Sequence, residues 1–322
     1  MKIAFRVDGS KALGMGHVNR CKIIAKNLKK LKVSCIFLTQ FTQVYENLLS
    51  EGFTVFFISK KNETQQVNEI LRKEHCSKFV IDSKRKSIGK LIANLNKKIK
   101  IIMIDNTYYS NYADLAIFSS LKDPKKQYPK NSVVGAQYVL HGIKIPPKPV
   151  RKKNNSILIS MGSSDKYNIT QKIITSFLKN NTLFDLTIVL GKYNENEQQL
   201  LKIINNDKRF HILKNSTSLV SLMSKTTMGI VTFGITVYES AICCLPLFVI
   251  SHSNENEDSA KLVAKYGWIS YVGKYDKINY DKVIKNVLNL MDNKKELKNM
   301  KQACLQIDGL GPLRVAKSIK KL

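Results

Sequence analysis

The strongest constraint on the fold is a repeated alternation of two patterns. Short apolar runs rich in β-branched residues alternate with longer stretches in which apolar residues recur every three or four positions. The first pair is the run at 2–7 and the amphipathic stretch at 16–31. Further strands are expected at 34–39, 54–58, 78–82, 100–105, 115–120 and 137–141, with a helix at 44–53. This alternation predicts a parallel sheet with helices on both faces.

The same pattern begins again after a proline-rich, basic segment at 142–155. Strands are then expected at 156–162, 185–191, 210–215, 228–234 and 245–251, with helices at 166–180 and from about Ser218, Ile235 and Asn256. We therefore predict an α/β protein of two Rossmann-like, doubly wound domains facing a cleft. The domains would span 1–145 and 156–307, joined by a linker at 146–155, and a C-terminal helix at 308–322 can pack back on the first domain. Ligands of such sheets bind beyond the carboxyl ends of the strands, so the cleft is the expected site.

The chain of 322 residues is long enough for two cores, and its formal net charge is +29. An excess this large can attract nucleic acid, a membrane surface or a phosphorylated ligand. However, only seven of the 53 basic residues are arginine, and the lysines are spread almost evenly. Readers of nucleic acid rely on clustered arginine, so the charge fits general composition better than a specific nucleic-acid surface. Weak peripheral membrane association through the lysines stays open.

The remaining composition leads us to expect a cytoplasmic protein, and we expect neither a metal nor a cofactor. The apolar run at 243–250 is too short to cross a bilayer, and residues 1–8 do not resemble a secretory signal. The six cysteines show no C-x-x-C spacing and are expected to be buried thiols in a reducing compartment. The spacings of a dinucleotide-binding loop and of a P-loop are both absent.

The first candidate site is FRVDGSKALGMGHVNRC, residues 5–21, where a glycine-rich turn follows a strand. Its glycines, among them Gly14 and Gly16, let backbone pass close to a ligand. His17 then stands at a helix start, where it is either a solvent-facing or packed residue or a functional base. A helix N-terminus disfavours a positive imidazolium, and a neutral imidazole can accept a proton. Asp8, at the end of the strand, is the predicted partner of the other ring nitrogen.

Three further candidate sites lie in the second half. In SMGSSDKYN, residues 160–168, small side chains follow a strand, and they either cap the next helix or let a diphosphate approach its N-terminus. Gly234 ends another strand, and Glu239 follows within a helix, where it is either a solvated residue or a ligand of a ribose diol. The stretch at 251–268 begins a further helix at the same edge and brings acidic residues into a basic background.

In this order, these motifs resemble one known family. FRVDGSKALGMGHVNRC resembles the N-terminal signature of the sugar-nucleotide hydrolases of pseudaminic acid biosynthesis, which release UDP from UDP-2,4-diacetamido-2,4,6-trideoxy-β-L-altropyranose. Related spore-coat polysaccharide proteins share it. Similar segments occur at 79–83 (FVIDS), 104–106 (IDN), 112–117 (YADLAI), 159–165 (ISMGSSD), 237–241 (VYESA) and 308–316 (DGLGPLRVA). The resemblance implies the two-domain GT-B fold, with UDP bound by the C-terminal domain.

The resemblance also implies the roles of individual residues. His17 would activate water, Gly162, Ser163 and Ser164 would touch the diphosphate, and Glu239 the ribose. The other expected substrate contacts are Gly14, Gly16, Arg20, Asp165, Gly234 and Asn256. The chain departs from the family at Lys84 (usually tyrosine), Asn106 (aspartate), 118–120 (an asparagine-containing segment), His141-Gly142 (arginine) and Glu255-Asn256 (Asn-Gln). These departures lie mostly in the expected sugar pocket, so the sugar stays open.

The preferred function is metal-independent hydrolysis of a UDP-sugar. A glycosyltransferase, in which His17 deprotonates a glycan or lipid-linked hydroxyl, is the alternative with the same fold. A basic binding protein for nucleic acid or for a partner in glycan assembly is the third hypothesis, and tight salt-sensitive RNA binding would favour it.

Overall fold

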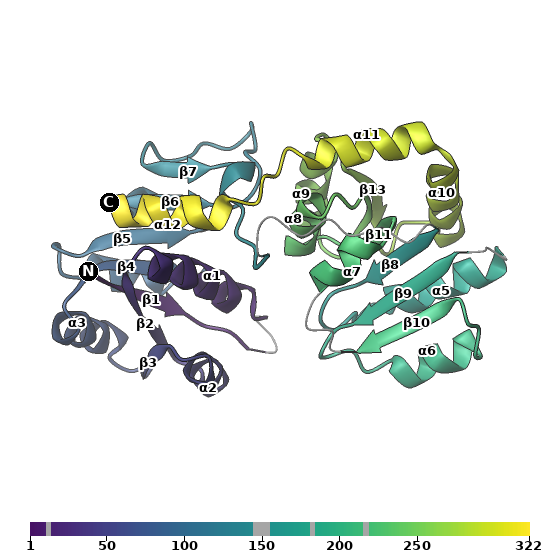
Figure 1. Cartoon of the computed structure of the whole chain (residues 1–322). Coiled ribbons are helices and arrows are strands. Elements are labelled where there is room, and N and C mark those ends of the chain that lie inside the picture. The colour runs from purple at the N-terminus through teal and green to yellow at the C-terminus, as the bar shows by residue number, and fades with distance from the viewer. Residues whose placement is uncertain (11–13, 144–154, 181–183, 215–218) are drawn as a thin grey trace. The chain divides into compact units, whose positions relative to one another are not determined.

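The computed structural model describes residues 1–10, 14–143, 155–180, 184–214 and 219–322. These residues form two compact units (Figure 1). Unit 1 comprises Met1–Gly142 and Gly309–Leu322, and unit 2 comprises Ile143–Asp308. The linker predicted at 146–155 lies, except for Asn155, outside the described residues.

Unit 1 contains a sheet of seven parallel strands in the order β3-β2-β1-β4-β5-β6-β7. The strands are β1 (Lys2–Val7), β2 (Ser34–Thr39), β3 (Thr54–Phe57), β4 (Cys76–Asp82), β5 (Lys100–Ile104), β6 (Leu115–Phe118) and β7 (Ser132–Val134). The chain builds the sheet outward from β1 to β3 and then returns to place β4 on the other side of β1. This reversal creates a topological switch point at the carboxyl ends of β1 and β4, which is where ligands of open α/β sheets bind.

Helices cover both faces of this sheet, as the alternating pattern predicts. Apolar residues of α1 (Gly16–Lys30), α2 (Thr42–Ser50) and α12 (Gly311–Lys321) join one core with β1, and those of α3 (Glu63–Lys73) and α4 (Ile88–Ala93) join the core of the opposite face. Figure 1 shows α12, the last element of the chain, beside α1, the first helix. The C-terminal helix thus lies in unit 1.

One predicted strand of unit 1 is wrong. The sequence predicts a strand at residues 137–141, but the 3₁₀ turn η2 (Ala136–Tyr138) overlaps the start of this segment and residues 139–141 form no strand. The seventh strand is instead β7, which is only three residues long. Gly135, at φ +122°, turns the chain between them.

Unit 2 repeats the same architecture with six parallel strands in the order β10-β9-β8-β11-β12-β13. These are β8 (Ser156–Ser160), β9 (Asp185–Leu190), β10 (Phe210–Lys214), β11 (Met228–Thr232), β12 (Leu247–Ser251) and β13 (Ile269–Lys274). The helices are α5 (Ile169–Lys179), α6 (Glu197–Ile204), α7 (Leu219–Lys225), α8 (Ile235–Ile242), α9 (Asn254–Ala264), α10 (Tyr280–Asp292) and α11 (Lys294–Cys304). Its switch point lies at the ends of β8 and β11. The prediction of two Rossmann-like, doubly wound sheets is confirmed.

Polar contacts fix α12 to unit 1. The buried ammonium of Lys78, on β4, donates hydrogen bonds of 2.8 Å to the carbonyls of Ile319 and Lys320, at the C-terminal end of α12. A cation at this end of a helix satisfies free carbonyls and complements the helix dipole. At the other end, His141 is buried and its Nε2–H donates to the carbonyl of Gly309 at 2.8 Å.

Candidate functional site

The switch point of unit 1 brings His17 against a buried carboxylate. His17 is the second residue of α1, the helix that follows β1, and Asp82 is the last residue of β4. Val7 and Asp82 are partners in the sheet register, so the two strand ends lie side by side. His17 Nδ1 lies 2.6 Å from Asp82 Oδ1, and the Asp82 side chain is 1% exposed while that of His17 is 26% exposed. The ring is thus fixed at one nitrogen and reachable by solvent.

Arg20 joins this pair one turn further along α1. Its Nε and Nη2 donate to Asp82 Oδ2 and Oδ1 at 3.1 and 2.8 Å, and its Nη1 donates to Asp105, the residue after β5. Asp105 also accepts hydrogen bonds from the backbone N–H and the hydroxyl of Ser119. Burial alone would lower the pKa of Arg20, but the two carboxylates outweigh it and raise that pKa, so Arg20 remains a cation.

These contacts indicate which ring nitrogen of His17 carries a hydrogen and which one can accept a proton. Asp82 is an acceptor, so His17 Nδ1 carries the hydrogen and donates it. Arg20 Nη2 lies 3.0 Å from the same nitrogen, but it cannot donate to a nitrogen that already bears a hydrogen. In the neutral ring the lone pair is therefore on Nε2, the nitrogen that Asp82 does not contact. A neutral imidazole oriented by a carboxylate in this way can accept a proton from water or from a hydroxyl.

The carboxylate at His17 is Asp82 and not Asp8, which corrects the expectation from the sequence. Asp8 is 5% exposed, and its Oδ1 accepts from Arg6 Nη1 at 2.6 Å, from the backbone N–H of Gln40 at 3.0 Å and from the Thr39 hydroxyl at 3.2 Å. Asp8 follows Val7 directly and leaves the strand toward the α3 side of the sheet, where Arg6 and Glu63 lie. It belongs to a separate polar cluster at the same sheet edge.

Gly14 and Gly16 of the first loop occupy open positions. Gly14 has φ +73°, which favours glycine, and its N–H donates to the carbonyl of Ser10 at 2.8 Å. Gly16 begins α1, and no atom lies within 4 Å of where its Cβ would stand. Residues 11–13 of this loop lie outside the described part of the chain.

At the switch point of unit 2, the loop after β8 is exposed. Gly162 has φ +83°, and Ser163 and Ser164 are exposed. Gly191, after β9, packs so closely on this loop that a Cβ there would stand 2.4 Å from the Gly162 carbonyl oxygen. Glycine is therefore required at 191 to hold the loop in place, a packing role that the sequence analysis missed.

Asp165 caps α5. Its two carboxylate oxygens accept from the N–H groups of Ile169 and Thr170 at 2.9 Å each, and it is 6% exposed. Burial raises the pKa of Asp165, and these N–H groups offset that only in part. The sequence left two roles open for this segment, capping the next helix or binding a diphosphate, and the structure shows that Asp165 caps α5. The two N–H groups that bind Asp165 are therefore not available to a phosphate.

A histidine that the sequence analysis did not single out lies beside this loop. His252 follows β12, and its Nδ1 is 2.8 Å from the hydroxyl of Thr232, which ends β11. Asn256, on the first turn of α9, places its Nδ2 3.1 Å from His252 Nε2, so the amide donates to Nε2 and Nδ1 carries the hydrogen. Thr232 Cγ2 lies 3.5 Å from the Cβ position of Gly162, so this trio borders the exposed loop. Burial and the charge of Lys166 lower the pKa of His252, which keeps the ring neutral at pH 7.

The two remaining predicted residues are on or next to α8. Gly234 precedes the helix with φ 175°, extended backbone that any residue adopts. Glu239 is half-buried within α8, on the helix that follows β11. In unit 2 the predicted residues Gly162 and Asn256 thus lie near each other, because Thr232 borders Gly162 and its partner His252 contacts Asn256. The role of Glu239 stays a prediction.

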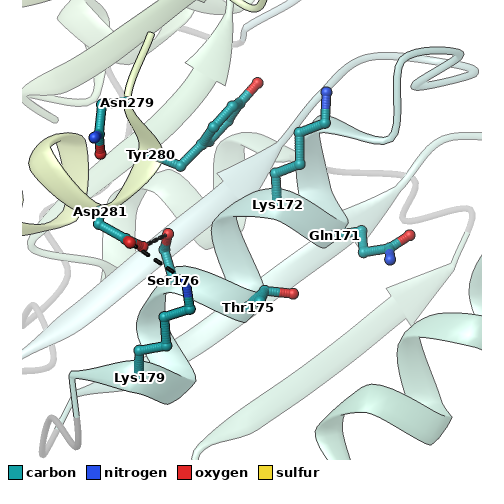
Figure 2. A pocket seen from close by; sticks show the side chains of 8 residues that line it. All are labelled: Gln171, Lys172, Thr175, Ser176, Lys179, Asn279, Tyr280 and Asp281. Carbon is teal, nitrogen blue, oxygen red and sulfur yellow. Dashed lines mark hydrogen bonds and ion pairs between the residues drawn. The ribbon is translucent and has the colours of Figure 1, made fainter.

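A small pocket elsewhere in unit 2 contains none of the predicted residues. It lies on the surface where α5 meets the start of α10 and has a volume of about 260 Å³ (Figure 2). The Asp281 carboxylate accepts from the Ser176 hydroxyl and lies 3.3 Å from Lys179 Nζ, whereas the Nζ of Lys172, which also lines the pocket, lies 5.6 Å from the centre of the Tyr280 ring.

Neither a metal centre nor a membrane helix is found in the described segments. Among those residues, no three histidine, cysteine, aspartate or glutamate side chains gather closely enough to hold a metal ion. No helix there has both the length and the apolar character needed to span a bilayer.

Comparison with known proteins places this geometry in context. No protein-family model matches the chain. It is 28% identical over 276 residues to an uncharacterized protein of Methanocaldococcus jannaschii, a match that covers 79% of this chain and 56%, about half, of that protein. It is 22% identical to the spore coat polysaccharide biosynthesis protein SpsG of Bacillus subtilis, covering all of this chain and 98% of SpsG. It is 23% identical to the UDP-2,4-diacetamido-2,4,6-trideoxy-β-L-altropyranose hydrolase of Campylobacter jejuni, covering 83% of this chain and 98% of the hydrolase.

Among solved structures, MurG of Acinetobacter baumannii matches the whole of both chains with a TM-score of 0.76 at 14% identity. The chain has the GT-B fold. The resemblance found in its motifs is confirmed, because the two named relatives are the spore-coat protein and the hydrolase. One of these relatives is, by its name, a hydrolase of a UDP-linked sugar, and the likeness to MurG concerns the fold.

Proposed function

We propose that this GT-B protein hydrolyses a UDP-linked acetamido sugar and releases UDP. His17 accepts a proton from a water molecule on Nε2, the water oxygen attacks the anomeric carbon, and the bond to the UDP oxygen breaks. The observation that carries the proposal is the 2.6 Å contact of His17 Nδ1 with Asp82, because it leaves Nε2 free to act as the base.

The nucleotide is assigned to unit 2. The exposed loop of Gly162, Ser163 and Ser164 presents small side chains beside the switch point, where backbone N–H groups can approach a diphosphate. Such preorganised donors stabilise a leaving diphosphate as its charge develops. The name of the Campylobacter relative supplies the acetamido sugar and the nucleotide, and that of SpsG supplies surface-polysaccharide biosynthesis as a setting. Nonulosonic-acid biosynthesis is the setting of the family that the sequence motifs resemble.

A glycosyltransferase is the rival with the same machinery. The similarity to MurG over the full chain supports it. In that reaction His17 would take its proton from a hydroxyl of a glycan or of a lipid-linked acceptor, and the sugar would be transferred to that oxygen.

Incubation of the protein with a panel of UDP- and CMP-linked sugars in water tests the proposal. Phosphorus and proton NMR would follow release of the nucleotide and report whether the anomeric configuration inverts. Hydrolysis predicts release of UDP with water alone, whereas a transferase would consume the sugar only when an acceptor is added.

His17→Ala should lower turnover by about 10²–10⁴-fold, the usual effect of losing a general base, and should leave the dissociation constant of UDP unchanged. His211→Ala is the matched control, because the His211 side chain is 52% exposed and lies on β10. Normal turnover of His17→Ala would rule out His17 as the base.

A further inference from the structure

A second polar cluster lies at the same edge of the unit 1 sheet as His17. Arg6 is fully buried on β1, and its Nε donates to Glu63 Oε1 at 2.7 Å while its Nη1 donates to Asp8 at 2.6 Å. Arg85, three residues beyond the end of β4, donates from Nη2 to the same Glu63 oxygen at 2.9 Å and from Nη1 to Gln40 Oε1 at 2.8 Å. The two arginines and two carboxylates balance in charge.

The contacts fix the orientation of each group. Oδ1 of Asp8 already accepts from Arg6, Thr39 and the backbone of Gln40, so the carboxylate cannot rotate freely. Arginine has only donors, so the side-chain atom of Gln40 that faces Arg85 is the oxygen, and the amide nitrogen points elsewhere. Burial would raise the pKa of Asp8 and of Glu63, but Arg6 and Arg85 hold both below their ordinary values, so both remain acceptors.

Three buried polar atoms of this cluster have no hydrogen-bond partner. They are the only such side-chain atoms in the described part of the chain: Arg6 Nη2, Asp8 Oδ2 and Gln40 Nε2. Arg85 Nη2 lies 3.6 Å from Asp8 Oδ2, which is beyond hydrogen-bond length. Burying a polar atom without a partner is unfavourable, so three such atoms on residues in contact with one another point to a ligand or water as their partner.

The free atoms specify the chemistry that would satisfy them. Two are N–H donors and one is a carboxylate acceptor, so the missing group must both accept and donate. A secondary amide does so through two atoms, its carbonyl oxygen and its N–H, and a hydroxyl or a water does so through a single oxygen. Arg85 is 29% exposed, so the cluster is open to solvent at its outer end. Asp8 adjoins Val7, the register partner of Asp82, and the cluster therefore borders the His17 site.

We propose that Arg6, Asp8 and Gln40 recognise an acetamido substituent of the sugar, with Arg6 Nη2 and Gln40 Nε2 donating to its carbonyl and Asp8 Oδ2 accepting from its N–H. This inference rests on the proposed function for the identity of the sugar, and it makes these residues determinants of specificity. It also explains why Asp8, although it does not hold His17, lies at the switch point.

Saturation-transfer NMR with free N-acetylglucosamine and free glucose tests this assignment without a nucleotide. The acetamido methyl group should receive strong saturation from the wild-type protein, and glucose should receive little. Gln40→Glu keeps an oxygen for Arg85 but replaces the free N–H donor by an acceptor and adds a negative charge, whereas Gln40→Met removes both the oxygen and the donor without adding charge. In each variant the methyl signal should fall about threefold or more, since losing one such bond weakens binding by about tenfold.

Gln43→Glu is the matched control, because it makes the same chemical change at an exposed residue of α2, three positions away. It should leave the methyl signal unchanged. Absence of saturation in the wild-type protein, or equal saturation in all variants with native melting curves, would overturn the proposal and leave a buried water as the occupant. A separate UDP titration tests the proposed function alone, because a protein that fails to bind UDP can still saturate the acetamido methyl.

Discussion

His17 depends on a carboxylate that lies 65 residues further along the chain. Asp82 receives both the imidazole and the guanidinium of Arg20, and Arg20 in turn reaches Asp105. Each of the two aspartates ends a buried apolar run, FVID and IMID, so the sequence contains a signal for them at the strand ends. The sequence does not contain the strand order that places β4 next to β1, and for that reason it favours Asp8, the nearest carboxylate along the chain, as the partner.

Replacing Asp82 separates positioning of the base from the base itself. Asp82→Asn removes one of the two oxygens that hold His17 and Arg20, so the Nε2 lone pair is no longer fixed. We expect turnover to fall by a large part of the ~10²–10⁴-fold that a general base contributes, with a changed pH profile of kcat and an unchanged affinity for UDP. Asp105→Asn leaves the His17–Asp82 contact intact and should have a smaller effect. Turnover of folded Asp82→Asn within twofold of wild type would contradict this role.

At the scale of elements, the alternation of strand and helix patterns in the sequence predicted both sheets, because parallel strands that are buried on both faces consist of nearly continuous apolar residues. It could not predict β7, whose three residues are too few to show a period, nor distinguish the apolar segment at 137–141 from a strand. Val139 and Leu140 in that segment are buried although they do not form a strand, so burial alone accounts for its apolar character. The loop after β8 was predicted from its glycine and small residues, whereas Gly191 and His252 gained their roles only through neighbours distant in sequence.

The docking of α12 provides a test of element packing. A Cβ on Gly311, the first residue of α12, would lie 2.2 Å from the carbonyl oxygen of Val139. Backbone must therefore move in Gly311→Ala, and we expect a loss of about 1–3 kcal/mol in the free energy of unfolding, measured by urea denaturation. Gly142→Ala, with no atom within 4 Å of its Cβ, is the control in the same unit. Equal stability of the two variants would show that α12 shifts freely on η2.

For the whole molecule, the shifted pKa values of buried groups and the net charge of +29 together determine how stability responds to acid. Arg6 and Arg85 hold the pKa of Asp8 and Glu63 low against the opposing effect of burial. Their stabilisation is therefore complete above the unfolded pKa of about 4 and is lost as pH falls through the still lower folded values. His252 acts at higher pH: because burial and Lys166 lower its pKa from 6.5, the unfolded chain binds a proton more readily and stability falls below about that pH.

Acid also removes negative charge from a molecule that already repels itself, so the net positive charge grows as pH falls. We expect the melting temperature to decline from pH 7 to pH 4, and 0.5 M sodium chloride to restore more of it at pH 4 than at pH 7, since salt shortens the range of repulsion. Thermal unfolding of the full chain at several pH values, with and without salt, measures both effects. If salt instead lowered the melting temperature at every pH, favourable surface ion pairs such as Lys100–Asp114 would outweigh the repulsion among the lysines.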